Sequence, residues 1–151
     1  MINSCRHPNN QCEAIILFRA KVDLMSQNTS DTIYEKIGGE KTIDSIIEAF
    51  YPRITADPVL STYFKHANVG KIMSMQKHFF TAATGGPLTY AGRPLGEVHH
   101  KLGISRYEFD LYVRHLTETL KDIGLTEEDC KQVVASINIY APDITTDIDA
   151  V

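Results

Sequence analysis

Apolar residues recur at helical spacing along most of the chain. Ile43, Ile46, Ile47, Phe50 and Ile54 follow one another at steps that place them on one face of a helix. The same spacing recurs in three further stretches, residues 69–83, 105–123 and 126–140. No stretch alternates convincingly between apolar and polar residues as a half-buried strand does. The pattern therefore predicts an all-α protein.

Start and stop signals divide these stretches into separate helices. Asp31 is predicted to cap a first short helix, because its side-chain oxygen can accept from a free backbone N–H. Ser105 and Glu108 have the spacing of a capping box, in which each side chain bonds the backbone N–H of the other residue. Thr126 is predicted to cap the last long helix, and Pro142 to stop it.

The first thirty residues differ from the rest of the chain, since they are rich in Asn, Gln and Ser and show weak helical periodicity. Residues 1–30 are predicted to be a loosely held N-terminal extension, 31–145 one helical domain and 146–151 a short C-terminal tail. Met25 opens a polar lead into this domain and is a second candidate for the start of the protein. The alternative is an additional helix over residues 14–25.

Composition and charge narrow the classes of function. The net charge of −4 lacks the basic excess of a nucleic-acid-binding domain. Cys5, Cys12 and Cys130 contain no CxxC pair and cannot all pair within one chain, which predicts reduced thiols in a cytoplasmic protein. The longest early apolar run, residues 14–18, is too short to cross a bilayer. We therefore expect no nucleic-acid partner and no integral membrane segment.

Two polar residues stand on or beside apolar helix faces. Tyr51 follows Phe50, and Gln76 lies within the apolar row of residues 69–83. A buried hydroxyl or carboxamide needs a partner. Either residue alone is more often a core group with only a structural role. Together, and with His99 downstream, they favour a shared buried object. A single imidazole suits haem, since the porphyrin supplies the other donors, and no His or Cys spacing resembles a zinc site.

Short motifs in order along the chain support this interpretation. From about Thr32 to Pro142, the sequence resembles the group I truncated haemoglobins, the short 2-on-2 globins. The matching segments are residues 33–39 (IYEKIGG), 50–51 (FY), 56–58 (ADP), 63–64 (YF), 76–80 (QKHFF), 85–87 (GGP), 90–93 (YAGR), 98–99 (VH) and 103–104 (GI). Each match is modest, but their joint order and spacing over about 110 residues is specific.

The resemblance implies a 2-on-2 helical sandwich around haem b and assigns roles to individual residues. His99 is similar to the proximal iron ligand, Tyr51 to the distal tyrosine that donates to the bound gas, and Gln76 to the distal glutamine that supports it. The other expected haem-site residues are Phe64 on the porphyrin face, Ile72 at the usual distal-histidine position, Phe80 as a gate in a ligand tunnel, Phe109, and Lys71 and Arg93 near the propionates.

Met75 departs from the family pattern, because some members carry a His or Lys there that occupies the sixth iron position. A thioether can also ligate haem iron, so Met75 is a candidate internal ligand. The alternative is that Met75 fills irregular space beside the porphyrin. Helical spacing alone explains its position, which favours the second interpretation.

The resemblance implies a protein that binds O₂, NO and CO at five-coordinate iron. Its task would be O₂ transport or the dioxygenation of NO to nitrate. The sequence has no flavin or nicotinamide fingerprint, so dioxygenation would need an external reductase. The alternatives are a haem-based gas sensor or electron carrier, and a haem-free helical interaction module. A monomer or weak dimer is expected.

Overall fold

The computed structural model describes residues 31–146. The predictions of an N-terminal extension, a start at Met25 and a helix over 14–25 therefore lie outside the described residues. So do Cys5, Cys12 and all but the first residue of the predicted tail.

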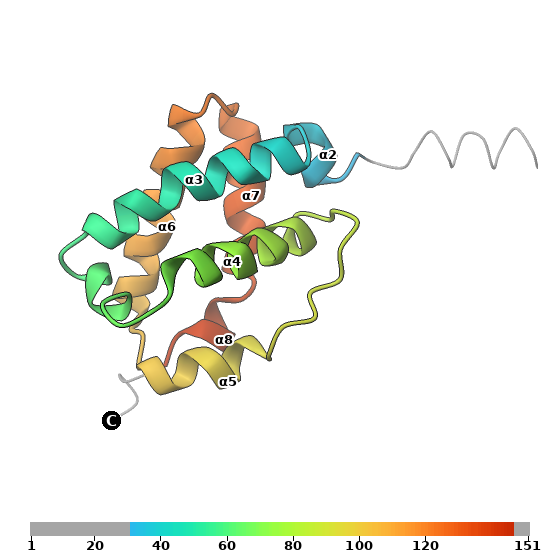
Figure 1. Cartoon of the computed structure of the whole chain (residues 1–151). Helices are drawn as coiled ribbons and strands as arrows, with labels where there is room; N and C mark the ends of the chain where they lie inside the picture. The colour runs from blue at the N-terminus through green and yellow to red at the C-terminus, as the bar shows by residue number, and fades with distance from the viewer. Residues whose placement is uncertain (1–30, 147–151) are drawn as a thin grey trace, which may run out of the picture. The chain divides into compact units, whose positions relative to one another are not determined.

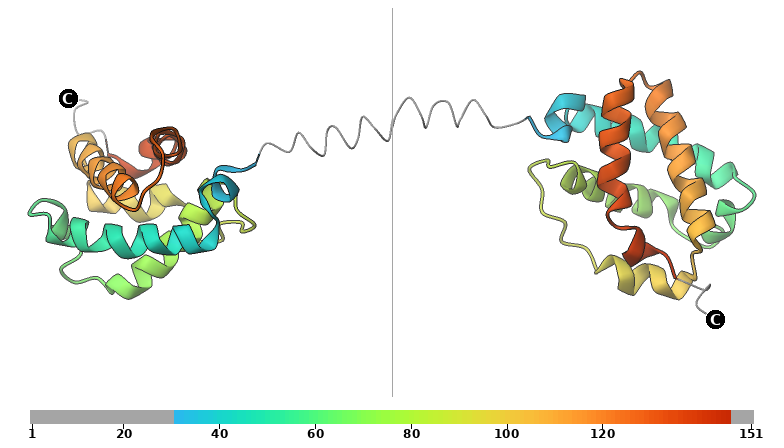
Figure 2. Two further views of the ribbon diagram at one scale, coloured as in Figure 1. Left: turned by 90° about the horizontal axis from the view of Figure 1, so that it is seen from above. Right: turned by 180° about the vertical axis from the view of Figure 1, so that it is seen from behind.

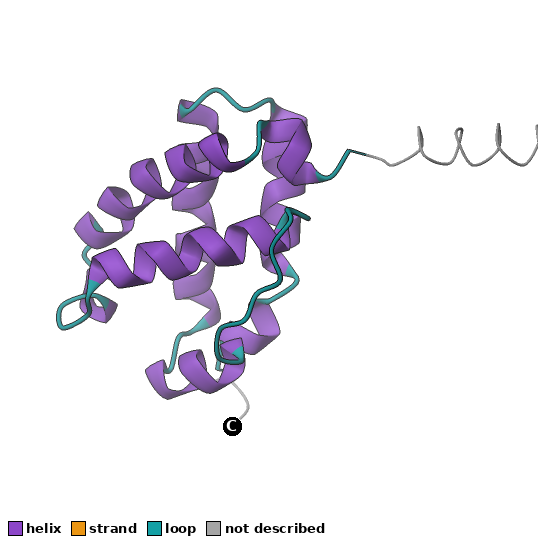
Figure 3. Ribbon diagram, turned by 45° about the vertical axis from the view of Figure 1, so that its right-hand side comes forward, coloured by secondary structure: helices purple, strands orange, loops and turns teal. Residues whose placement is uncertain are grey.

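Every regular element between residues 31 and 146 is helical, as Figure 3 shows. The prediction of an all-α protein is confirmed. The elements are α2 (Ile33–Ile37), α3 (Glu40–Ala56), η1 (Leu60–Tyr63), α4 (Val69–Ala83), α5 (Leu95–His99), η2 (His100–Leu102), α6 (Arg106–Asp122), α7 (Glu127–Asn138) and α8 (Ala141–Ile144). None of these helices is long and apolar enough to cross a membrane.

The four long helices form two layers (Figures 1 and 2). Helix α3 packs against both α4 and α6, and α6 packs against α7. In the view from above, α3 and α4 make one layer and α6 and α7 the other. The short helix α5 lies beside α8. A long loop over residues 84–94 connects α4 to α5.

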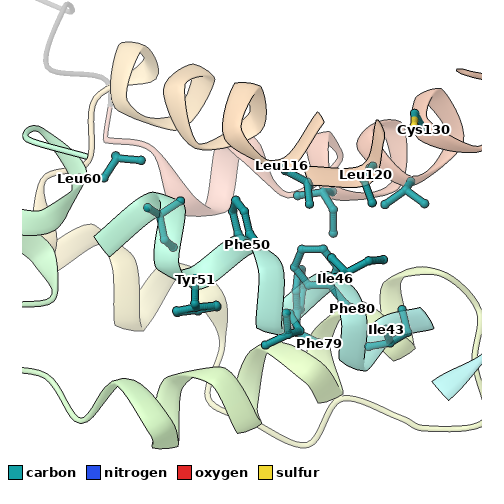
Figure 4. Packing of buried hydrophobic residues seen from close by; sticks show 14 residues of the cluster. Ile43, Ile46, Phe50, Tyr51, Leu60, Phe79, Phe80, Leu116, Leu120 and Cys130 are labelled. Atoms are coloured by element: carbon teal, nitrogen blue, oxygen red, sulfur yellow. The ribbon is translucent and has the colours of Figure 1, made fainter. Parts of the chain in front are cut away.

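The core lies where α3 meets the neighbouring long helices. Phe50 and Ile54 of α3 are completely buried, as are Leu116 and Leu120 of α6. Figure 4 shows Phe50 pointing toward these leucines, whereas the next side chain, Tyr51, points to a different side of α3. The apolar row predicted for this helix therefore makes the core contacts, and Tyr51 is left for another surface.

Most helix ends agree with the prediction, but two differ. Ser105 and Glu108 form the predicted capping box, and the Thr126 hydroxyl accepts from a backbone N–H of α7. Asp31 is not the cap of α2; Thr32 is, because it forms a complete capping box with Glu35.

Pro142 does not directly stop the last long helix. Helix α7 ends at Asn138, and Pro142 lies at the start of α8. Proline is tolerated there because the first backbone N–H groups of a helix have no intrahelical partner.

Candidate functional site

A cavity of about 220 Å³ lies among the helices, and its walls are mainly apolar. Every element from α3 to α8 contributes to its lining. The lining residues are Tyr51, Leu60, Tyr63, Phe64, Ile72, Met75, Gln76, Phe79, Tyr90, Leu95, Val98, His99, Leu102, Ile104, Phe109, Tyr112, Ile137 and Ile144.

Tyr51 brings a phenol into this apolar space from α3. The side chain is only 2% exposed, and its ring makes an edge contact with Phe64, with centroids 6.1 Å apart. Burial, and to a lesser extent the neighbouring Tyr112, raises the pKa of the Tyr51 hydroxyl well above its usual range. The hydroxyl is therefore uncharged and carries a proton that it can donate.

Gln76 enters the same cavity from α4, and its partner is a tyrosine. The Tyr112 hydroxyl, on α6, lies 3.4 Å from Gln76 Oε1 and donates to it. Burial raises the pKa of Tyr112 as well. Tyr51, Tyr112 and Gln76 thus share a mainly apolar cavity.

His99 reaches the cavity from a different element, as the last residue of α5. Its Nδ1 lies 2.8 Å from the carbonyl oxygen of Leu95. A carbonyl can only accept, so this bond places the imidazole proton on Nδ1 and leaves the lone pair on Nε2. Neutral imidazole in this tautomer is the form that ligates a metal through Nε2. The hydrogen bond from Nδ1 to the Leu95 carbonyl fixes the orientation of the ring.

The structure brings together most of the residues predicted for the haem site. Phe64, Ile72, Met75 and Phe109 line the cavity together with Tyr51, Gln76 and His99. Three predicted residues are not in the lining. Lys71 and Arg93 are exposed, and Phe80 is completely buried in the core. The adjacent Phe79, not Phe80, contributes to the cavity wall.

Tyr112 is the functional candidate that the sequence analysis missed. It lies on the apolar face of α6 and is easily taken for a core residue. The available signal was a third polar group on an apolar helix face, of the same kind as Tyr51 and Gln76. Its partner Gln76 lies 36 residues away, so the pairing was not visible in the local pattern.

Comparison with known proteins shows the family to which the chain belongs. The model of the bacterial-like globin family matches residues 32–146. A group 1 truncated hemoglobin from Mycolicibacterium paratuberculosis is 36% identical over 115 residues, which is 76% of this chain and 85% of that protein. Another from Synechocystis is 34% identical over 108 residues, 69% of this chain and 87% of that protein. The chain belongs to the group 1 truncated haemoglobins.

Solved structures give the same assignment. The truncated hemoglobin of Tetrahymena pyriformis, in its Fe(III) form, has a TM-score of 0.73 at 30% identity and covers 76% of this chain and 97% of its own. The hemoglobin of Chloroflexus aurantiacus has a TM-score of 0.67 at 32% identity. The match covers 76% of this chain and 98% of that protein. The predicted 2-on-2 fold is confirmed. As a truncated globin, the chain uses haem as its cofactor and binds diatomic gases.

The residues of the cavity fit haem in two respects. His99 offers one oriented imidazole nitrogen, and a porphyrin needs only one such protein ligand. Met75, Val98 and Leu102 line the cavity yet are 36–47% exposed. A large apolar disc would cover such side chains and remove them from water.

Proposed function

We propose that the chain binds O₂, NO and CO on five-coordinate haem iron, and that Tyr51 and Gln76 stabilise bound O₂ by hydrogen bonding. The observation that carries this proposal is the Tyr51 phenol. It is almost fully buried in a mainly apolar cavity, and no described residue lies in hydrogen-bonding geometry with its hydroxyl. The hydroxyl lines the cavity with its donor free, and a gas bound there would supply the acceptor.

Each side chain contributes a distinct part to this function. Ferrous haem supplies the binding site for the gas and the one electron that combining O₂ with NO to form nitrate requires. Nε2 of His99 would hold the iron, and Phe64 and Phe109 would pack against the porphyrin. The Tyr51 hydroxyl would donate a hydrogen bond to the gas. Because the surrounding wall is mainly apolar, this hydrogen bond would be stronger than the same bond in bulk solvent.

The physiological task is proposed to be O₂ transport or NO dioxygenation, with an external reductase returning the electron in the second case. We also propose a reducing, cytoplasmic setting for a monomer or weak dimer. The absence of a CxxC pair among the three cysteines of the sequence supports the reducing setting.

The Tyr51→Phe variant tests the hydrogen bond. O₂ draws electron density from iron and develops partial negative charge, whereas CO develops less. A hydrogen bond to a charged acceptor contributes roughly 1.5–3 kcal/mol. O₂ dissociation should therefore become roughly ten- to a hundredfold faster in stopped-flow measurements, with a smaller change for CO. Tyr107→Phe, which alters a tyrosine that is 66% exposed on α6, is the matched control. Unchanged O₂ dissociation in Tyr51→Phe would remove Tyr51 from this role.

Mixing the oxygenated protein with NO separates the two tasks. Rapid formation of one nitrate for each haem, together with conversion to the ferric spectrum, is the result expected of a dioxygenase. Slow conversion limited by O₂ dissociation would instead support O₂ transport.

A further inference from the structure

Tyr112 brings a half-buried phenol to the cavity, and the position of this phenol depends on long-range packing. Tyr112 lies on α6, and its ring is held by two aromatic neighbours. It makes an edge contact with Phe50, with centroids 4.9 Å apart and planes at 83°. It stacks with Phe109 at 6.2 Å and 18°. These contacts restrict the ring on two sides, so the place of its hydroxyl is well determined.

The hydroxyl is directed at one atom of Gln76. It lies 3.4 Å from Oε1, which can only accept, so the phenolic proton points toward the carboxamide oxygen. This bond is longer than an ideal O–H···O bond and is correspondingly weak. The carboxamide is planar, with its oxygen and nitrogen on opposite branches. When Tyr112 engages Oε1, the Nε2 donor group is turned away from Tyr112.

We propose that Tyr112 is a positioning residue for gas binding, which holds the Gln76 carboxamide so that its Nε2–H donor faces the bound ligand. Without Tyr112, the carboxamide can rotate and present its oxygen to the same place. That orientation would repel the negative charge that develops on O₂. The inference rests on the proposed function and extends it, because Tyr112 acts through Gln76 and not on the gas itself.

A double-mutant cycle tests this inference. Tyr112→Phe keeps both aromatic contacts and removes only the hydroxyl. Loss of one weak neutral hydrogen bond predicts O₂ dissociation faster by about two- to tenfold, and Tyr107→Phe again serves as the control on α6. Gln76→Leu should also speed dissociation. In the Gln76→Leu background, adding Tyr112→Phe should then have no further effect, because the residue through which it acts is gone.

The C–O stretching frequency of the CO complex gives an independent readout, since a donor near the CO oxygen lowers it. Tyr112→Phe should raise this frequency or split the band, and should leave it unmoved in the Gln76→Leu background. A shift that persists in that background would overturn the inference, because Tyr112 would then act on the gas directly. So would a Tyr112→Phe protein that matches the Tyr107→Phe control in both measurements.

The two proposals fail in different ways. If only the role of Tyr112 is wrong, Tyr51→Phe still speeds O₂ dissociation. If hydrogen bonding from Tyr51 is wrong, that variant releases O₂ at the unaltered rate whatever Tyr112 does.

Discussion

The tyrosines that line this cavity have different neighbours, and we propose different tasks for them. Tyr63 lines it, but burial and the adjacent carboxylate of Glu108 raise the pKa of Tyr63 to about 12. A carboxylate beside this hydroxyl offers it an acceptor other than a bound gas. The pKa of Tyr51 is raised by burial and by Tyr112, and no carboxylate contributes to it. The residue type alone therefore does not identify the gas-binding donor; its surroundings do.

Met75 also lines the cavity, and its side chain is 41% exposed. The position is compatible with a thioether that covers the edge of the porphyrin, and we expect this packing role and not iron ligation. The Met75→Leu variant should therefore keep the five-coordinate ferrous spectrum of the parent protein, because leucine fills similar space without a sulfur atom. A change from a six-coordinate to a five-coordinate ferrous spectrum on substitution would establish Met75 as an internal ligand.

At the scale of elements, Asp57 ties the end of α3 to two other segments. One carboxylate oxygen accepts from the backbone N–H groups of Val59 and Leu60, at 2.8 and 3.0 Å. The other lies 2.8 Å from Nε2 of His115 on α6. This junction follows the turn of α3 that carries Tyr51, and Leu60 beside it lines the cavity. The pair therefore helps to hold α3, η1 and α6 in register around the site.

The same junction predicts an acid dependence of stability. The bond with His115, followed by backbone N–H groups, lowers the pKa of Asp57 below its ordinary value of 3.8. Because the pKa of Asp57 is lower in the folded protein than in the unfolded chain, the ionised carboxylate stabilises the fold at pH values above its pKa in the unfolded chain. That stabilisation is lost as the pH falls through the folded value.

Asp57→Asn keeps the shape and the acceptor for the backbone N–H groups but cannot ionise. Its free energy of unfolding should be lower than that of the parent at neutral pH and should fall less steeply below about pH 4. Chemical denaturation over a pH series measures both. Parallel pH curves for the two proteins would contradict the assignment.

The sequence predicted those features of the elements that depend on near neighbours. The capping box of Ser105 and Glu108 joins residues three positions apart, so its pattern is visible in a short window. The error at Asp31 has the same local cause: Thr32 pairs with Glu35 at the same spacing, and the completed box satisfies two backbone groups where a single cap satisfies one.

At the scale of the whole molecule, the sequence indicated a cavity but not all of its walls. Phe79 and Phe80 are adjacent and equally apolar, and they project about 100° apart around a helix. Phe79 faces the cavity and makes edge contacts with Tyr90 and Tyr140, which are distant in sequence, so no local pattern records the choice. The Tyr112–Gln76 bond was hidden for the same reason, since it forms only when α4 and α6 pack around the site.

The central claim is that the imidazole of His99 alone anchors the haem to the protein. Replacing His99 with glycine and titrating the protein with haem tests it most directly, with His100→Gly as the control, because His100 is an exposed neighbour. We predict that His99→Gly loses the native iron coordination spectrum and that free imidazole restores it, whereas His100→Gly is unaffected. A His99→Gly protein that binds haem with the native affinity and spectrum, without added imidazole, would contradict the account.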